Sequence, residues 1–229
     1  GEELRDTLCR ESVTYTVRRN NIEVTASHRF CNAAPVTIAI YYGMQSMFEG
    51  ETHVLTPGGA YTDWTEVAKA STFTKQEHPL FRRYVEKNRQ GYQSTWLLPD
   101  GLGDHALLDG QDDIFIYAPY GKSYHKLIGN KRMENGDKTC WRGVYTWFET
   151  PIADDADLLC YEGSVGGHTA VFIDCKRACK RTLALPGYLD LRHFGTAEQN
   201  SGIRISAAGR NKLKIKAGAP GSCVLLLRE

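Results

Sequence analysis

Between positions 20 and 48, apolar and polar residues alternate in two successive runs, and this pattern constrains the fold more than any other feature of the chain. In Ile22–Phe30 one side carries Ile22, Val24, Ala26, His28 and Phe30, and the other carries Glu23, Thr25, Ser27 and Arg29. A period of two is typical of a half-buried antiparallel strand. Cys31–Pro35 predicts a turn. A second strand, Val36–Tyr42, is then expected to carry on one face Val36, Ile38, Ile40 and Tyr42.

Short segments of strand-like composition recur along the chain, and most are separated by turns containing glycine or proline. Val13–Arg18 is predicted to form a hairpin with Ile22–Phe30, and further strands are expected at Thr52–Leu55, Tyr92–Leu98, Asp113–Ala118, Cys140–Glu149, Asp157–Tyr161, His168–Asp174, Ile203–Ser206, Lys212–Lys216 and Cys223–Leu227. Glu77–Asn88 has a helical spacing instead. We predict a single all-β domain over residues 1–229, a large antiparallel β-sandwich of two packed sheets with less than about a fifth of the residues in helices.

The charge balance argues against several classes of partner. Twenty-eight basic residues oppose 27 acidic ones, so the sequence predicts no nucleic-acid binding. No apolar run reaches the roughly 18 residues of a membrane-spanning helix, so no transmembrane segment is expected. The chain begins at Gly1 without a signal peptide, and it can be one domain of a longer protein.

The spacing of the cysteines is not that of a zinc site. The chain contains no CxxC pair, and its closest couple is Cys175 and Cys179. We expect most cysteines to be small buried hydrophobic residues and allow a single disulfide among Cys9, Cys31, Cys140, Cys160, Cys175, Cys179 and Cys223.

The segment after the second predicted strand resembles a motif of sugar-processing proteins. The order of strand, asparagine-containing turn, strand and then Gly43–Phe48 (GMQSMF) resembles the start of the catalytic half of the galactose-mutarotase-like β-supersandwich family. In that family the third position of the motif is commonly a histidine that handles a sugar-ring proton, and here it is Gln45. A glutamine amide has no proton to exchange near pH 7. The resemblance therefore implies a sugar-contacting surface more readily than mutarotase chemistry, in a protein that is secreted or periplasmic.

Tyr42 and Gln45 are the first candidates for carbohydrate contact. They follow a predicted strand, and binding groups in β-proteins are usually displayed at strand ends. Planar amides and aromatic faces are the groups that sugars require. The alternative is that Tyr42 and Met44 belong to the core.

A second group of candidates, His53, Asp63 and Trp64, lies on either side of the turn at Pro57–Gly59. This turn could bring His53 opposite Tyr61 or Asp63, where a carboxylate would orient the imidazole. Trp64 could offer a stacking face for a sugar. We expect Thr52–Leu55 to lie beside the preceding strand in one sheet, so that these residues surround one opening with Tyr42 and Gln45. The alternative is a hairpin with a structural tryptophan.

Cys140–Glu149 predicts one long strand with an aromatic face, which contains Trp141, Gly143, Tyr145, Trp147 and Glu149. Such a face would suit a carbohydrate platform, and a packed core between sheets is the alternative. Glu162 and His168 flank the loop Gly163–Gly167 and could form an acid–base pair. The candidate catalytic residues are therefore His53, Glu149, Glu162 and His168.

The segment Leu97–Asp113 is rich in aspartate and glycine, which is also typical of an ordinary solvated loop. We expect no cofactor, and calcium is the one alternative. Its ligands there would be Asp100, Asp104, Asp109 and Asp112.

Three functions remain open from sequence. The first is a carbohydrate-binding protein, or an accessory to glycan processing. The second is a sugar-processing enzyme, epimerase-like or glycoside-cleaving, that uses a His/Glu acid–base pair. The third is a structural sandwich domain. The feature that separates them is whether the tryptophan and tyrosine residues are exposed in one cleft beside a histidine and a glutamate.

Overall fold

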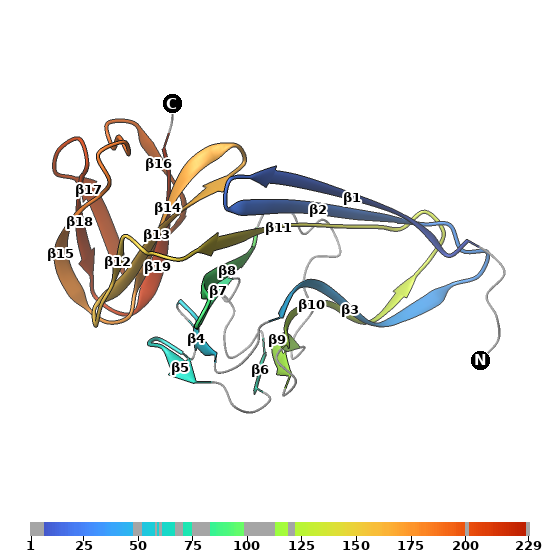
Figure 1. Cartoon of the computed structure of the whole chain (residues 1–229). Helices are drawn as coiled ribbons and strands as arrows, with labels where there is room; N and C mark the ends of the chain where they lie inside the picture. Colours follow the sequence, from blue (N-terminus) through green and yellow to red (C-terminus); the bar gives the residue numbers. More distant parts are fainter. Residues whose placement is uncertain are drawn as a thin grey trace.

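A computed structural model describes residues 7–47, 52–57, 59, 61–66, 71–74, 83–98, 113–118, 122–199 and 202–227. Within these residues nineteen strands form four antiparallel sheets, and there is no helix (Figure 1). The all-β prediction is therefore confirmed, although the described strands form four sheets instead of two. We name these sheets A to D.

The strand order of each sheet places distant parts of the sequence side by side. Sheet A has the order β1 (Cys9–Arg18), β2 (Asn21–Phe30), β11 (Lys138–Phe148), β8 (Gly91–Leu97), β7 (Arg83–Asn88), β4 (His53–Leu55) and β5 (Thr65–Glu66). Sheet B has the order β3 (Val36–Met47), β10 (Lys122–Met133), β9 (Asp113–Ala118) and β6 (Ser71–Thr74). Sheet C has the order β12 (Ala153–Asp154), β13 (Leu158–Val165), β14 (His168–Cys175), β19 (Gly221–Leu227) and β16 (Phe194–Gln199). Sheet D has the order β15 (Cys179–Ala184), β18 (Lys212–Ala217) and β17 (Ile203–Ala207).

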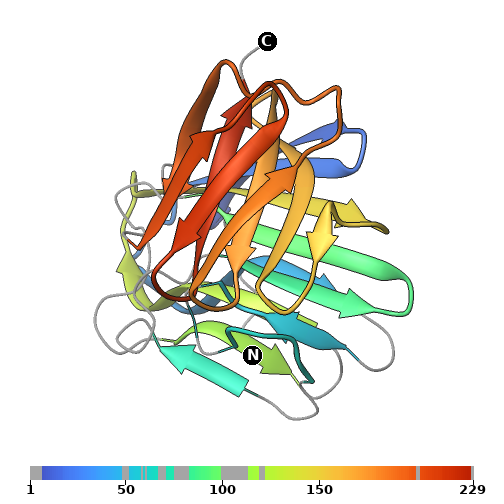
Figure 2. The ribbon, with the colours of Figure 1, turned by 90° about the vertical axis from the view of Figure 1, so that its left-hand side faces the viewer.

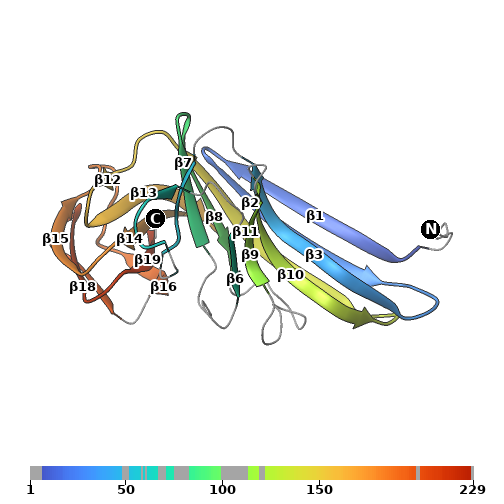
Figure 3. The same ribbon diagram turned by 90° about the horizontal axis from the view of Figure 1, so that it is seen from below.

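The sheets are stacked in the order D, C, A, B, as the view from below shows (Figure 3). A hydrophobic core fills each of the three gaps. Leu158, Ile173 and Leu213 belong to the core between C and D, which forms the carboxyl-terminal sandwich in the foreground of Figure 2. Trp96 and Phe172 meet between A and C, and Val24 and Met44 lie between A and B.

Sheet A lies in the interior of the stack because its central strands are apolar on both faces. On β8, Trp96 packs toward sheet C and the next residue, Leu97, packs toward sheet B. On β11, Val144 packs toward sheet C and Trp141 toward sheet B. Successive side chains of a strand point to opposite faces, so one segment contributes to two cores.

Gly143 allows sheet B to approach sheet A closely. A Cβ atom at this position would lie 2.1 Å from Sδ of Met44, and the Met44 side chain is fully buried. The sulfur of β3 therefore occupies the space that a larger residue on β11 would need. This contact holds the two sheets together beside the candidate site.

Sheet C is also buried on both faces, and this explains the most apolar segments. β14 and β19 pair in register from Thr169↔Leu227 to Cys175↔Gly221. Cys160, Cys175 and Cys223 are buried in the core between C and D. Cys9, Cys31, Cys140 and Cys179 are only partly buried, so the prediction that most cysteines are buried is wrong. All seven cysteines are free thiols, so the disulfide that the sequence allowed is not formed.

The predicted hairpin at the start of the chain is confirmed, since β1 pairs with β2 along its whole length. The second strand differs from its prediction, because β3 continues to Met47. The residues predicted to share one face do not do so: Ile38 packs against the core between A and B, whereas Ile40 is 53 % exposed. The partner strand β10 explains this, because its register with β3 shifts on both sides of Lys126.

Two further predictions are corrected. Glu77–Asn88 was expected to allow a helix, but its last six residues form strand β7, and residues 75–82 lie outside the described part of the chain. Thr52–Leu55 was expected beside the preceding strand, but β3 belongs to sheet B and β4 to sheet A. Arg83–Glu86 is buried on both faces of β7, so this segment lacks the alternation of apolar and polar residues that indicates a strand.

Candidate functional site

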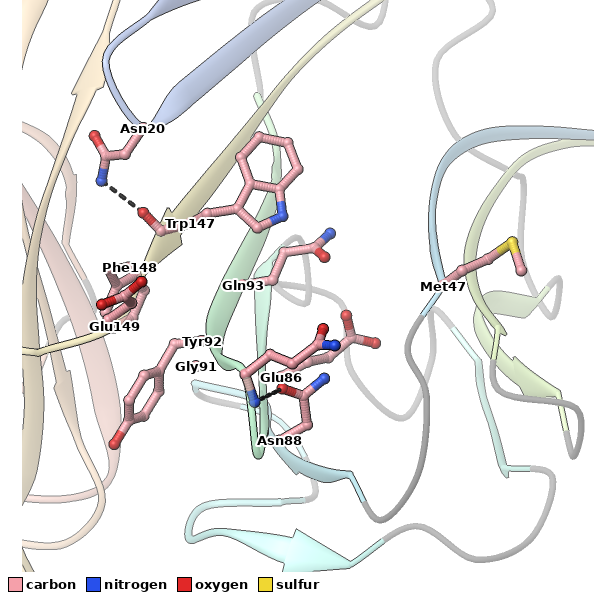
Figure 4. A pocket seen from close by; sticks show the side chains of 11 residues that line it. Asn20, Met47, Glu86, Asn88, Gly91, Tyr92, Gln93, Trp147, Phe148 and Glu149 are labelled. Carbon is pink, nitrogen blue, oxygen red and sulfur yellow. Dashed lines mark hydrogen bonds between the residues drawn. The ribbon is translucent and has the colours of Figure 1, made fainter.

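A cleft of 870 Å³ lies at one end of sheet A, beside the end of β3. Figure 4 shows that Trp147, Gln93 and Glu86 turn into this opening from three neighbouring strands, with Met47 on the opposite side. Asn20 and Asn88 add amide groups at the rim. The cleft therefore combines an aromatic ring with planar polar groups.

Strand pairing places the three central residues in one row. Trp147 of β11 is opposite Gln93 of β8, and Gln93 is opposite Glu86 of β7. Residues directly opposite in antiparallel strands share a face. Because neighbouring strands lie about 4.8 Å apart, Trp147 and Glu86 are separated by about 10 Å across the sheet.

The aromatic face of β11 is buried near the start of the strand and exposed at its end. Trp141 is only 7 % exposed, Tyr145 is half-buried, and Trp147 is 39 % exposed. The rings of Tyr145 and Trp147 stack with their centroids 5.8 Å apart. The aromatic face predicted from sequence is therefore core at one end and an open platform at the other.

Tyr145 also fixes the position of β3 beside the cleft. Its hydroxyl donates a hydrogen bond of 2.9 Å to the carbonyl oxygen of Gln45 and accepts one of 3.0 Å from the backbone N–H of the same residue. One side chain of sheet A thus binds both backbone groups of a residue in sheet B. This contact holds β3 at the edge of the cleft, next to the stacked rings of Tyr145 and Trp147.

Glu86 lies at the floor of the cleft in a buried network of hydroxyl groups. Its two carboxyl oxygens accept hydrogen bonds from Ser46 at 2.7 Å and from Ser123 at 2.9 Å. The two serine oxygens are 2.6 Å apart, and both lie within 3.2 Å of the Tyr84 hydroxyl. The network joins β7 of sheet A to β3 and β10 of sheet B.

Burial makes Glu86 a weak acid. With 3 % of its surface exposed, the cost of removing the carboxylate from water raises its pKa from 4.5 to about 8, although the two serine hydrogen bonds lower it. Glu86 is therefore mainly a neutral carboxylic acid at pH 7.

The residues predicted to surround one opening are divided between separate places. Gln45 and Tyr42 are exposed, but they lie within strand β3 and not at its end, so the structure corrects that part of the prediction. Tyr42 packs against the Tyr124 ring at a centroid distance of 4.7 Å. Sheet A receives Met44 and Ser46 of this strand instead.

Trp64 and Asp63 belong to an ion cluster that joins sheets A and C. The indole N–H of Trp64 donates a 2.9 Å hydrogen bond to Asp154, which also binds the ammonium groups of Lys87 and Lys176 at 2.9 Å each. Burial alone would raise the pKa of Asp154, but these hydrogen bonds hold it at about 2. Asp63 lies 3.3 Å from Lys176. These contacts favour a structural role for Trp64 over a sugar-stacking one.

The four candidate catalytic residues do not form an acid–base site together. His53 lies opposite Glu66, not opposite Tyr61 or Asp63. Glu149 lines the cleft and lies beside Phe148 in Figure 4. Glu162 accepts a 2.6 Å hydrogen bond from Tyr188, and His168 is exposed at the turn between β13 and β14.

A second, smaller cavity of 200 Å³ lies where β1 and β2 meet Tyr41. Its histidine, His28, is buried, and its two ring nitrogens are hydrogen-bonded to Thr139 and Glu11 at 2.9 Å each. Both nitrogens therefore have protein partners. This cavity offers less polar surface than the main cleft, and we do not assign a ligand to it.

The proposed calcium ligands Asp100, Asp104, Asp109 and Asp112 lie outside the described residues. Within the described part of the chain, no cluster of three metal-binding side chains is present. The same residues contain no helix long and apolar enough to cross a membrane.

Comparisons of the chain with protein-family models, with curated proteins and with solved structures find no significant match. The function must therefore be inferred from the cleft itself. Sequence reasoning identified Trp147 and Glu149 but missed Glu86, Gln93 and Ser46. Arg89 and Gln90 form a two-residue connection, which is typical of a hairpin. Recognising this hairpin in the sequence would have placed Glu86 opposite Gln93.

Proposed function

We propose that this protein binds carbohydrate in the cleft, with the Trp147 ring as the surface on which a sugar ring stacks. The observation that carries this proposal is the exposure of Trp147 in a cleft that Gln93, Asn20 and Asn88 also line. Ligand sites are usually concave and combine apolar surface with a few placed polar groups. Amides can both donate to and accept from sugar hydroxyls.

The charges of the cleft favour an uncharged sugar. The described residues that line it include Glu86 and Glu149 but no lysine or arginine. A sulfated or carboxylated glycan would meet negative potential from Glu149 without a cation to compensate. We therefore expect neutral glycans to bind in preference to acidic ones.

Binding is proposed in preference to catalysis. The described residues lining the cleft contain no histidine, and Glu86 has its carboxyl oxygens bound to two serines. The carboxyl pair of a glycosidase must face across one bond. Glu149 lies beside Phe148 and not in the row of Trp147, Gln93 and Glu86 (Figure 4).

The test is a glycan array followed by calorimetry with the best neutral ligand. A stacking contact is worth on the order of 1 kcal/mol, so Trp147→Ala should weaken binding at least about five-fold, and Gln93→Ala should also weaken it. Tyr188→Ala is the matched control, because Tyr188 is 71 % exposed and lies on the carboxyl-terminal sandwich. Unchanged affinity in Trp147→Ala would refute the proposal, as would an array on which no neutral glycan binds.

A further inference from the structure

A row of exposed apolar residues on β1 continues the platform beyond the cleft. Val13, Tyr15 and Val17 are alternate residues on one face of this edge strand, and they are 37 %, 66 % and 69 % exposed. Tyr15 and Val17 lie opposite Val24 and Ile22 of β2. Because opposite residues share a face, this row lies on the face of sheet A that packs against sheet B.

The same face carries Trp147, and the half-buried residues Ile22 and Tyr145 lie between Trp147 and Val17. Val24 lies opposite Gly143 of β11, four residues before Trp147. Ile22 lies opposite Tyr145, two residues before Trp147. Tyr145 links them: its ring stacks on Trp147. Burial is the main cause that raises the pKa of Tyr145 to about 12, and the nearby Tyr15 hydroxyl adds to this effect. Tyr145 and Trp147 lie two residues apart on β11, and β2 lies between β11 and Tyr15 of β1.

Resting on the proposed function, we propose that the binding surface extends from the cleft to Tyr15 and Val17, so that its ligand is a linear, uncharged oligosaccharide. From the spacing of strands and residues, the Cα atoms of Trp147 and Tyr15 are about 17 Å apart. That span exceeds what one sugar ring can cover. The residues Val13, Tyr15 and Val17 carry no charge, which matches the uncharged ligand expected in the cleft.

The second aromatic residue makes a specific prediction about chain length. A disaccharide stacked on Trp147 does not reach Tyr15, whereas a longer chain contacts both rings. Affinity should therefore increase with the number of sugar units in the wild-type protein. In Tyr15→Ala the affinity for the disaccharide should be unchanged, and the affinity for the hexasaccharide should fall about five-fold.

The experiment measures affinity by calorimetry for cello-, manno- and xylo-oligosaccharides of two to six units. The proteins are the wild type, Tyr15→Ala, Trp147→Ala and the control Tyr188→Ala, each checked by its melting curve. Loss at every length in Trp147→Ala with length-dependent loss in Tyr15→Ala supports the extended site. Equal affinity of Tyr15→Ala and wild type for the hexasaccharide overturns it while the cleft stands, and unchanged binding in Trp147→Ala removes both proposals.

The exposed face of β1 has one competing occupant, a second copy of this chain paired along the edge strand. Sedimentation of the wild-type protein and of Tyr15→Asp separates the two. A monomer at every concentration supports the glycan surface. A dimer that Tyr15→Asp dissociates assigns the face to the second copy and overturns the extended site.

Discussion

Replacing Glu86 by glutamine should remove a large part of the dependence of stability on pH. In the unfolded chain this carboxyl group ionises near 4.5, and in the folded protein its pKa is about 8. Between these values the folded state binds the extra proton, so each rise in pH favours unfolding. The stabilisation is fully present below pH 4.5 and is lost as the pH rises through 8.

The size of the effect follows from the two pKa values. At about 1.4 kcal/mol per pH unit, the interval from 4.5 to about 8 corresponds to about 5 kcal/mol of unfolding free energy. Glu86→Gln stays neutral at every pH, and its amide can replace the carboxylic O–H as a donor within the Ser46 and Ser123 network. At pH 9 the variant should therefore be more stable than the wild type by several kcal/mol, and at pH 5 the two should be similar.

The measurement is urea unfolding followed by tryptophan fluorescence at pH 5, 7 and 9, for the wild type and Glu86→Gln. Glu149→Gln is the matched control, because it removes an exposed carboxyl group from the same cleft. Other titrating groups contribute equally to all three proteins, so the difference between curves isolates Glu86. Parallel curves for wild type and Glu86→Gln would show that this carboxyl group is ionised in the folded protein and would refute the reasoning.

Two further predictions concern the contacts that hold the sheets together. Gly143→Ala places a methyl group 2.1 Å from the Met44 sulfur and should cost about 1–3 kcal/mol, measured by urea unfolding; if Met44→Ala in the same chain brings no recovery, the clash is not the cause. Trp64→Phe removes the hydrogen bond to Asp154 and should cost about 1 kcal/mol while leaving glycan affinity unchanged in calorimetry. A loss of glycan affinity in Trp64→Phe would return that residue to the binding site.

The all-β fold and most strand positions were predictable because they depend on local pattern. The alternation in Ile22–Phe30 and the apolar run Cys223–Leu227 require only that one face, or both, be buried. The strand β10 was missed because its apolar residues do not alternate regularly, and its register with β3 shifts. The face of Tyr42 could not be read for the same reason, since a bulge reverses every side chain beyond it.

The candidate site shows the same division. Trp147 and the aromatic face of β11 are visible in sequence, because alternation specifies which residues share a face. Which part of that face is core and which part is open depends on where sheet B ends, and this is decided by contacts such as Met44 on Gly143. Trp64 illustrates the opposite outcome: its aspartate and lysine partners come from β12, β7 and the turn after β14.

The sequence by itself determined the class of fold, the hairpin of β1 and β2, and the residues of β11 that share an aromatic face, because each depends on periodicity within a short segment. Only the tertiary structure decided that Trp147, Gln93 and Glu86 form one row and that Glu86 keeps its proton. Strand order in a sheet is set by which apolar faces can be buried together across the whole chain. The pKa of a carboxyl group is set by its distance from water, and both are properties of the assembled layers.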